Sequence, residues 1–69
     1  TESPVSIEEA ESLVRGKASD PDGEIHIRQE GGDGRPRYEG SYFSGDMEYE
    51  FEIDPNTGII FDWNADLRR

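Results

Sequence analysis

Residues 47–54, MEYEFEID, alternate strictly between large apolar and acidic side chains, and this pattern limits the possible folds more than any other feature. Successive side chains of a β-strand point to opposite faces. The pattern therefore predicts a strand with one apolar face, made by Met47, Tyr49, Phe51 and Ile53. The acidic face would carry Glu48, Glu50, Glu52 and Asp54. Because a shift of one residue would exchange these faces, we expect a sheet that is covered on one side and meets water on the other.

The size and charge of the chain narrow its possible functions. A chain of 69 residues supports one domain with a thin core, so a deep cofactor cleft is not expected. The net charge of −10, with only 7 Lys and Arg residues, argues against nucleic-acid binding and leaves a basic partner, a divalent cation or simple solubility as its explanation. No cysteine and no apolar run long enough to span a bilayer are present. We expect a single domain over residues 1–69, and because the chain starts at Thr1 rather than Met, we expect this domain to be taken from a longer protein.

A helix is predicted before the strands. Ser6 and Glu9 have the spacing of a capping box, which places the helix start at Ile7, and Gly16 is a plausible end. The residues that recur at helical intervals on one face are Ile7, Ala10, Leu13 and Val14. A helix of about ten residues is marginal alone, so it needs a sheet beneath it.

Three further strands are predicted around this pattern. Ile25 and Ile27 alternate with polar residues, and residues 30–36 form a glycine-rich loop before a strand at Arg37–Phe43. Asp54 and Pro55 favour a turn, which Gly58 closes in the left-handed conformation. The last strand would carry three residues on one face, namely Ile59, Phe61 and Trp63, with Ile60 and Asp62 on the other. The expected fold is α+β, with one N-terminal helix on a roughly four-stranded antiparallel sheet.

A two-residue turn at Ser44 and Gly45 would fix the register of the central hairpin. It pairs Tyr42 with Met47, Gly40 with Tyr49, and Tyr38 with Phe51; on the acidic face it sets Arg37 against Glu52, Arg35 against Asp54, and Ser41 against Glu48. A four-residue loop would keep the faces and shift the partners.

The usual catalytic and metal patterns are incomplete, so we expect no catalytic residue, no metal and no cofactor. Residues 18–29 match part of a calcium loop through Asp20 and Asp22 but have Ala18 and Gln29 at the first and last ligand positions. His26 is the sole histidine and no cysteine accompanies it, so a zinc site or a hydrolase triad lacks its partners. Neighbouring carboxylates in the acidic row of residues 48–54 are spaced at distances that acid–base catalysis could use. No pocket is indicated around them, so a solvent-exposed strand face explains them better.

The chain resembles the PepSY domain over about residues 5–64. The resemblance lies in VSIEEA, GRPRYEG and YEFEID followed by PNTGIIFDW, and it is most specific at Tyr49–Phe61. It departs from the usual pattern at Gly40, where an aliphatic residue is common, and at Ile59, where a polar one is. The resemblance implies an extracytoplasmic bacterial protein, secreted or a surface lipoprotein, and a role in binding or restraining a peptidase.

We therefore expect a non-enzymatic protein-interaction module that contacts no membrane itself. Its partner would be a protein, either a peptidase or a second copy of the domain. One helix cannot cover both faces of a four-stranded sheet, and aromatic residues dominate binding hot spots. The partner-binding residues we predict are Tyr38, Tyr42, Phe61, Trp63, Glu48, Glu50 and Glu52. A structural spacer or self-associating unit of a multidomain protein is the alternative, and an enzyme is a third possibility that no residue pattern supports.

Overall fold

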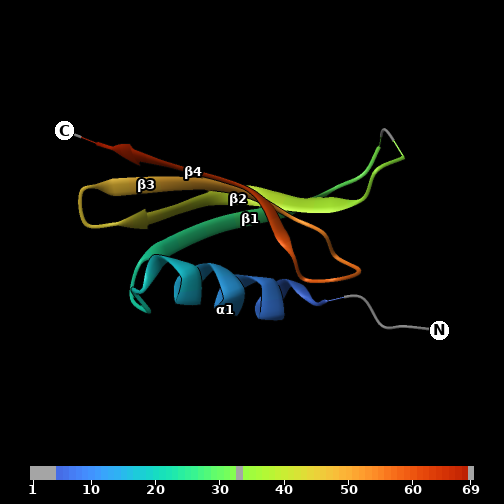
Figure 1. The fold of residues 1–69 in the computed structure, drawn as a ribbon, viewed down its shortest axis with the longest axis horizontal. Helices are drawn as coiled ribbons and strands as arrows, with labels where there is room; N and C mark the ends of the chain where they lie inside the picture. Colours follow the sequence, from blue (N-terminus) through green and yellow to red (C-terminus); the bar gives the residue numbers. More distant parts are fainter. Residues whose placement is uncertain (1–4, 33, 69) are drawn as a thin grey trace.

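The computed structural model describes residues 5–32 and 34–68 and shows one helix packed on a four-stranded antiparallel sheet (Figure 1). The strands follow each other in chain order across the sheet. The elements are α1 (Ile7–Ala18), β1 (Glu24–Glu30), β2 (Arg37–Ser44), β3 (Met47–Ile53) and β4 (Ile60–Leu67). The predicted α+β arrangement is confirmed.

Helix α1 begins where its capping box predicts and ends later than its glycine suggested. The Glu9 backbone N–H donates to Ser6 Oγ at 3.1 Å, and the Ser6 N–H donates to Glu9 Oε1 at 2.8 Å. The helix passes through Gly16 and ends at Ala18, because Ser19 takes the left-handed conformation (φ 60°) and its N–H caps the last turn. The prediction of an end at Gly16 is therefore wrong by two residues, and the added Ala18 packs against the core.

The faces of the central hairpin agree with the alternating pattern, but the predicted partners are wrong. Ser44 pairs with Met47, so the turn residues are Gly45 and Asp46, and Gly45 takes the required positive φ of 60°. Every partner is consequently shifted by two residues. The observed pairs on the helix side are Tyr42 with Tyr49, Gly40 with Phe51, and Tyr38 with Ile53; those on the other side include Glu39 with Glu52, Ser41 with Glu50 and Phe43 with Glu48.

Strand β4 contains a bulge that separates residues predicted to share a face. Ile53 pairs with Ile60 and Glu52 pairs with Asp62, so Phe61 is an extra residue on β4. The turn before it is as predicted, with Gly58 at φ 77° and its N–H donating to the Asp54 carbonyl at 2.8 Å. Because of the extra residue, Ile60 and Trp63 join the helix side. The grouping of Ile59 and Phe61 with Trp63 is therefore wrong.

The core lies between α1 and the middle of the sheet. Its buried apolar residues are Ala10, Val14, Tyr38, Tyr42, Phe51 and Ile53. Helix α1 packs mainly against β1 and β2, so it leaves the β4 side of the same face less covered. Leu13 reflects this position, because it belongs to the apolar helix stripe and is still 40% exposed.

Two tyrosines of β2 tie the sheet to segments far away in the sequence. The Tyr42 hydroxyl accepts from the Gly23 N–H at 2.9 Å and donates to the Asp20 carbonyl, so it holds the turn between α1 and β1. The Tyr38 hydroxyl donates to the Val5 carbonyl at 2.6 Å, and the Val5 N–H donates to the Pro55 carbonyl at 2.6 Å. Both buried hydroxyls are thus satisfied, which makes their burial affordable in so small a core.

Gly40 allows β1 to approach β2 closely. A Cβ atom at this position would collide with the backbone carbonyl of His26 on β1. Gly40 pairs with Ile27 on β1 and with Phe51 on β3, in the middle of the sheet. The glycine at this place in a strand is therefore explained by backbone contact.

Candidate protein-binding face of the sheet

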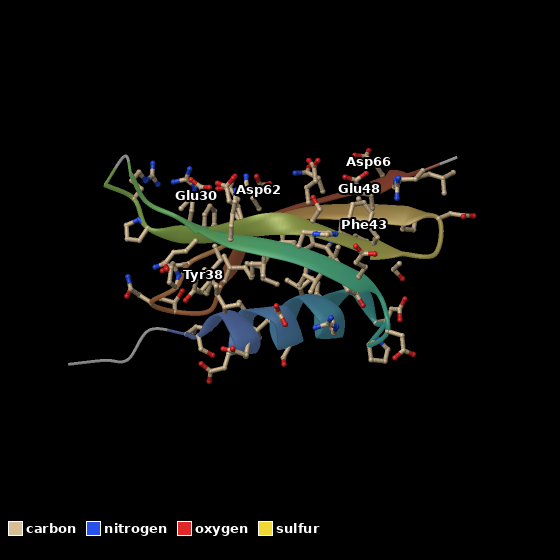
Figure 2. All side chains as sticks on the ribbon, turned by 180° about the vertical axis from the view of Figure 1, so that it is seen from behind. Glu30, Tyr38, Phe43, Glu48, Asp62 and Asp66 are labelled. Atoms are coloured by element: carbon tan, nitrogen blue, oxygen red, sulfur yellow. The ribbon has the colours of Figure 1, made fainter. Side chains whose placement is uncertain are left out.

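The sheet has one face turned away from α1, which we call the open face. Figure 2 shows Glu30, Phe43, Glu48, Asp62 and Asp66 projecting from this face, while Tyr38 points toward the helix. The strand registers arrange the open face into three rows that cross all four strands, and Glu30 pairs with Arg37 beside them. These rows are Arg28–Glu39–Glu52–Asp62, His26–Ser41–Glu50–Asn64 and Glu24–Phe43–Glu48–Asp66. Four strands of alternating side chains therefore present one continuous and mainly polar surface.

Charge is unevenly distributed over the open face. The β3 and β4 half carries five carboxylates, Glu48, Glu50, Glu52, Asp62 and Asp66. The β1 and β2 half carries Arg28 and Arg37 among its acids. A partner would therefore meet a mixed surface over the first two strands and a predominantly acidic one over the last two.

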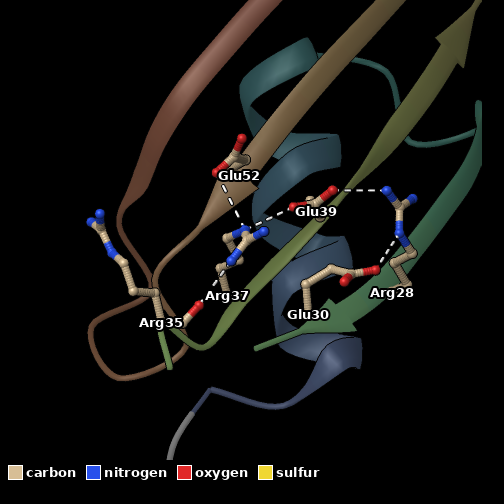
Figure 3. A network of polar contacts seen from close by, with 6 residues as sticks. All are labelled: Arg28, Glu30, Arg35, Arg37, Glu39 and Glu52. Atoms are coloured by element: carbon tan, nitrogen blue, oxygen red, sulfur yellow. Dashed lines mark hydrogen bonds and ion pairs between the residues drawn. The ribbon is translucent and has the colours of Figure 1, made fainter. Parts of the chain in front are cut away.

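The arginines of β1 and β2 form a network with the neighbouring acids (Figure 3). Arg37 Nε lies 2.7 Å from Glu39 Oε2 and 3.7 Å from Glu52 Oε1. Arg28 bridges two strands, with Nη2 2.7 Å from Glu39 Oε1 and Nε 2.7 Å from Glu30 Oε2. Because these pairs are at least partly exposed, they contribute little to stability, and their main effect is to set the local charge pattern.

An open groove lies at the end of the sheet, between Arg35 and Pro36 on one side and the turn over residues 54–59 on the other. Its volume is about 750 Å³, and it is lined by Arg35, Pro36, Arg37, Glu52, Asp54, Asn56, Ile59 and Phe61. Ile59 is 60% exposed and Phe61 is 54% exposed, so the groove offers apolar surface beside charged groups of both signs. This combination suits an apolar side chain flanked by polar backbone or side-chain groups.

The predicted partner-binding residues are divided among three environments. Tyr38 (6% exposed) and Tyr42 (fully buried) belong to the core, so they cannot form part of a binding surface and their inclusion is wrong. Helix α1 covers this part of the sheet, which a strand pattern alone does not reveal. Phe61 lies in the groove, whereas Trp63 is half-buried on the helix side and stacks on Tyr49 with ring centroids 5.0 Å apart.

The three glutamates of the prediction lie on the open face, as the alternation indicated. Glu48 is 3.6 Å from Arg68 Nε, and Glu52 contacts Arg37. Glu50 is exposed and forms no ion pair within residues 5–32 and 34–68. Whether these residues bind a partner stays a prediction.

The calcium-like stretch acts as a turn in this structure. Asp20 Oδ1 accepts from the Asp22 N–H at 2.9 Å, and Asp20 Oδ2 accepts from the Ser44 hydroxyl. These hydrogen bonds, that of Ser44 foremost, hold the pKa of the Asp20 carboxyl below its ordinary value. Within the described ranges, no cluster of three or more histidine or acidic side chains has the arrangement of a metal site. His26 is exposed, with Nε2 2.7 Å from Glu24 Oε2.

Several residues of the face were missed from the sequence. Phe43 is half-buried on the open face, edge-on to His26 at 5.7 Å between ring centroids, and the Arg68 guanidinium lies 4.8 Å above its ring. Phe43 directly follows Tyr42, so the alternation of a strand places the two side chains on opposite faces. The position of Phe43 on the open face could therefore have been predicted from the sequence. Ile59 in the groove carried no such signal, because its face depends on the bulge at Phe61.

The fold and this face define a class: small α+β domains in which one helix covers one face of an antiparallel sheet with sequential strands. Residues 4–63 match the sequence model of the PepSY family, described as the peptidase propeptide and YPEB domain. The chain belongs to the PepSY family. Domains of this family serve as propeptide or regulatory domains, are generally non-catalytic and occur in extracytoplasmic proteins.

No curated protein and no solved structure matches the chain. Among the described residues, no helix has the length and apolarity needed to cross a membrane.

Proposed function

We propose that this domain is a non-enzymatic protein-binding module that regulates a peptidase in an extracytoplasmic bacterial protein. The observation that carries the proposal is the match of residues 4–63 to a family of peptidase propeptide domains. The open face supports it, because among the described elements α1 covers only the opposite side of the sheet, and the open face carries charged rows beside a groove with both apolar and charged walls.

The groove supplies the features expected of an interface anchor point. Phe61 and Ile59 expose apolar surface at its wall, and Arg35 and Arg37 provide planar guanidinium groups nearby. Aromatic side chains and arginines carry a large share of binding energy at protein interfaces, whereas the surrounding polar residues mainly exclude water. Phe61 is therefore the residue at which we expect the largest loss of binding on truncation.

Titration of the purified domain against secreted bacterial peptidases tests the proposal. The panel contains one metallopeptidase, one serine peptidase and one cysteine peptidase, each assayed with labelled casein. We expect a saturable change in the rate of at least one peptidase, while mass spectrometry shows that the domain remains intact. An unchanged rate for all three, together with no complex on size-exclusion chromatography with them, would contradict the proposal.

Three variants locate the contact. Phe61→Ala should weaken the effect about tenfold, as expected for a hot-spot side chain. Glu50→Lys reverses one exposed charge on the open face and should alter the salt dependence of binding. Glu8→Lys makes the same charge change on the exposed side of α1 and should leave binding unchanged.

A further inference from the structure

Strand β4 forms an uncovered edge of the sheet. It pairs with β3 on one side, and no other strand of the described chain lies beyond it. The Arg68 N–H donates to the Asp46 carbonyl at 2.6 Å, which continues the register that pairs Met47 with Leu67. Hydrogen-bonded pairs alternate along an antiparallel ladder. Asp66 and Asn64 therefore bond to β3, whereas the backbone groups of Trp63, Ala65 and Leu67 point outward.

The two faces of this edge differ in chemistry. Asp62 and Asp66 project onto the open face, where their partners on β3 are Glu52 and Glu48. On the helix side, Trp63 is half-buried and Leu67 is 63% exposed. An added strand would therefore place alternate side chains against carboxylates and against apolar groups.

Helix α1 leaves room beside this edge because it packs mainly on β1 and β2. Lys17 of α1 contacts β4, with its Nζ 5.3 Å from the centre of the Trp63 ring. Soluble proteins commonly protect a sheet edge with lysine, proline or a bulge. From Asp62 to Leu67, β4 contains neither lysine nor proline, and its bulge at Phe61 lies before this segment.

We infer that β4 binds an extended segment of a partner protein, in which basic and apolar residues alternate, by addition of a fifth strand. This inference rests on the proposed protein-binding function and names the surface and the partner chemistry for it. The residues opposite Trp63 and Ala65 are apolar, and those opposite Asp62 and Asp66 are Lys or Arg. The segment thus has two basic residues four positions apart with apolar residues just inside them.

The geometry of strand pairing strengthens this charge requirement. Trp63, Ala65 and Leu67 form the hydrogen bonds to the new strand. Asp62 and Asp66 bond to β3 instead, so they occupy non-hydrogen-bonded positions with respect to the new strand. In an antiparallel pair the Cα atoms at such positions are closer, at about 4.5 Å, than at hydrogen-bonded ones. The Lys or Arg residues of the partner that face Asp62 and Asp66 are therefore in close cross-strand contact with these carboxylates, which stabilises the strand pair.

A second copy of this chain fits the edge poorly. Antiparallel pairing of two β4 strands along their full length gathers Asp62 and Asp66 of both copies on one face. Each copy also carries a net charge of −10. Like charges across a strand pair are destabilising, so a basic segment is the better occupant.

A synthetic peptide containing Lys-Val-Thr-Ile-Lys, with blocked termini, tests the inference on the intact chain. Binding is followed by the emission of Trp63, the one tryptophan of the chain, and by backbone amide hydrogen exchange. We expect a blue shift and slower exchange at Trp63, Ala65 and Leu67, with no protection of β1. A peptide with Glu in place of both Lys residues should bind at least about tenfold more weakly.

Two variants separate backbone from charge recognition. Ala65→Pro removes an outward N–H without removing a bond to β3 and should weaken peptide binding about tenfold or more, while urea unfolding checks that the variant is folded. The double variant Asp62→Lys/Asp66→Lys should weaken peptide binding by a similar factor, because it reverses the charges that face the Lys residues of the peptide. Glu24→Lys with Glu30→Lys makes the same charge change on the other edge strand, β1, and should leave the affinity unchanged.

The outcomes distinguish this inference from the proposed function. Peptide protection of β4 that both β4 variants weaken supports the inference. Absence of binding below about 1 mM peptide, protection elsewhere, or dimers formed through β4 would overturn it. A peptidase effect that persists unchanged in the Ala65→Pro and Asp62→Lys/Asp66→Lys variants would also overturn it and would leave the proposed function standing.

Discussion

Strands β2 and β4 both carry aromatic residues, yet the structure uses them differently. Tyr38 and Tyr42 of β2 are buried, and their hydroxyls bond to backbone groups of distant turns. On β4, Phe61 is 54% exposed and Trp63 is half-buried. The difference follows from the position of α1, which packs mainly on β1 and β2. The aromatic residues of β2 therefore belong to the core, whereas those of β4 leave apolar surface available beside acidic side chains.

Truncation of one aromatic residue in each half gives the largest expected contrast. Tyr42→Ala removes a buried ring and should cost about 3–5 kcal/mol, which is comparable to the whole stability of a domain this small. Trp63→Ala removes a half-buried ring and should cost about 1–2 kcal/mol. Urea unfolding followed by circular dichroism measures both. Equal losses in the two variants would show that α1 does not divide the sheet in this way.

Loss of a hydroxyl sharpens the comparison without creating a cavity. Tyr42→Phe leaves the Gly23 N–H and the Asp20 carbonyl without this partner, and should cost about 1–3 kcal/mol. Tyr49→Phe is the matched control, because within the described ranges no hydrogen bond of the Tyr49 hydroxyl is present, and it should be nearly neutral. Urea unfolding measures both variants. An unchanged free energy of unfolding in Tyr42→Phe would contradict the anchoring role of this hydroxyl.

A smaller effect is expected at the turn that Tyr42 holds, where Ser44 donates to Asp20. This bond is the main reason that the Asp20 pKa is lowered in the folded protein. A lowered pKa contributes stability that is complete above the unfolded pKa and is lost as the pH falls through the folded pKa. Ser44→Ala should therefore be destabilising near neutral pH, and the difference from the native chain should shrink in acid.

NMR titration of the carboxyl carbons measures this directly. The Asp20 pKa should be higher in Ser44→Ala than in the native chain. An unchanged Asp20 pKa would show that the Ser44 hydroxyl does not cause the lowered pKa of Asp20.

The smallest effect on stability is expected in the groove. Phe61→Ala and Ile59→Ala remove exposed side chains and should each change the free energy of unfolding by less than about 0.5 kcal/mol. Their effect on partner binding should be larger than their effect on folding. A loss of stability near that of Tyr42→Ala would place these residues in the core and contradict their role as a free surface.

The sequence predicts the two faces of β3 well because the period of two is unbroken over residues 47–53. It does not predict the register with β2, since a two-residue turn could be placed at Ser44 and Gly45 or at Gly45 and Asp46. A bulge such as that at Phe61 leaves no composition signal, so the faces of Ile59 and Trp63 could not be assigned together.

The candidate site was predictable only in part for a related reason. The acidic residues of β3 follow from alternation, and they lie on the open face as expected. The burial of Tyr38 and Tyr42 depends on where α1 crosses the sheet, which is a tertiary property. Sequence alone could therefore identify aromatic residues and could not decide which of them form the core.

Amide hydrogen exchange along β4 of the free domain provides the most direct test of an open edge. The amides of Asn64 and Asp66 donate to β3 and should be protected, whereas those of Trp63, Ala65 and Leu67 face water and should exchange close to the rate of an unstructured chain. Equal protection of all five amides, or fast exchange at Asn64 and Asp66, would show that β4 is covered or is not paired in this register.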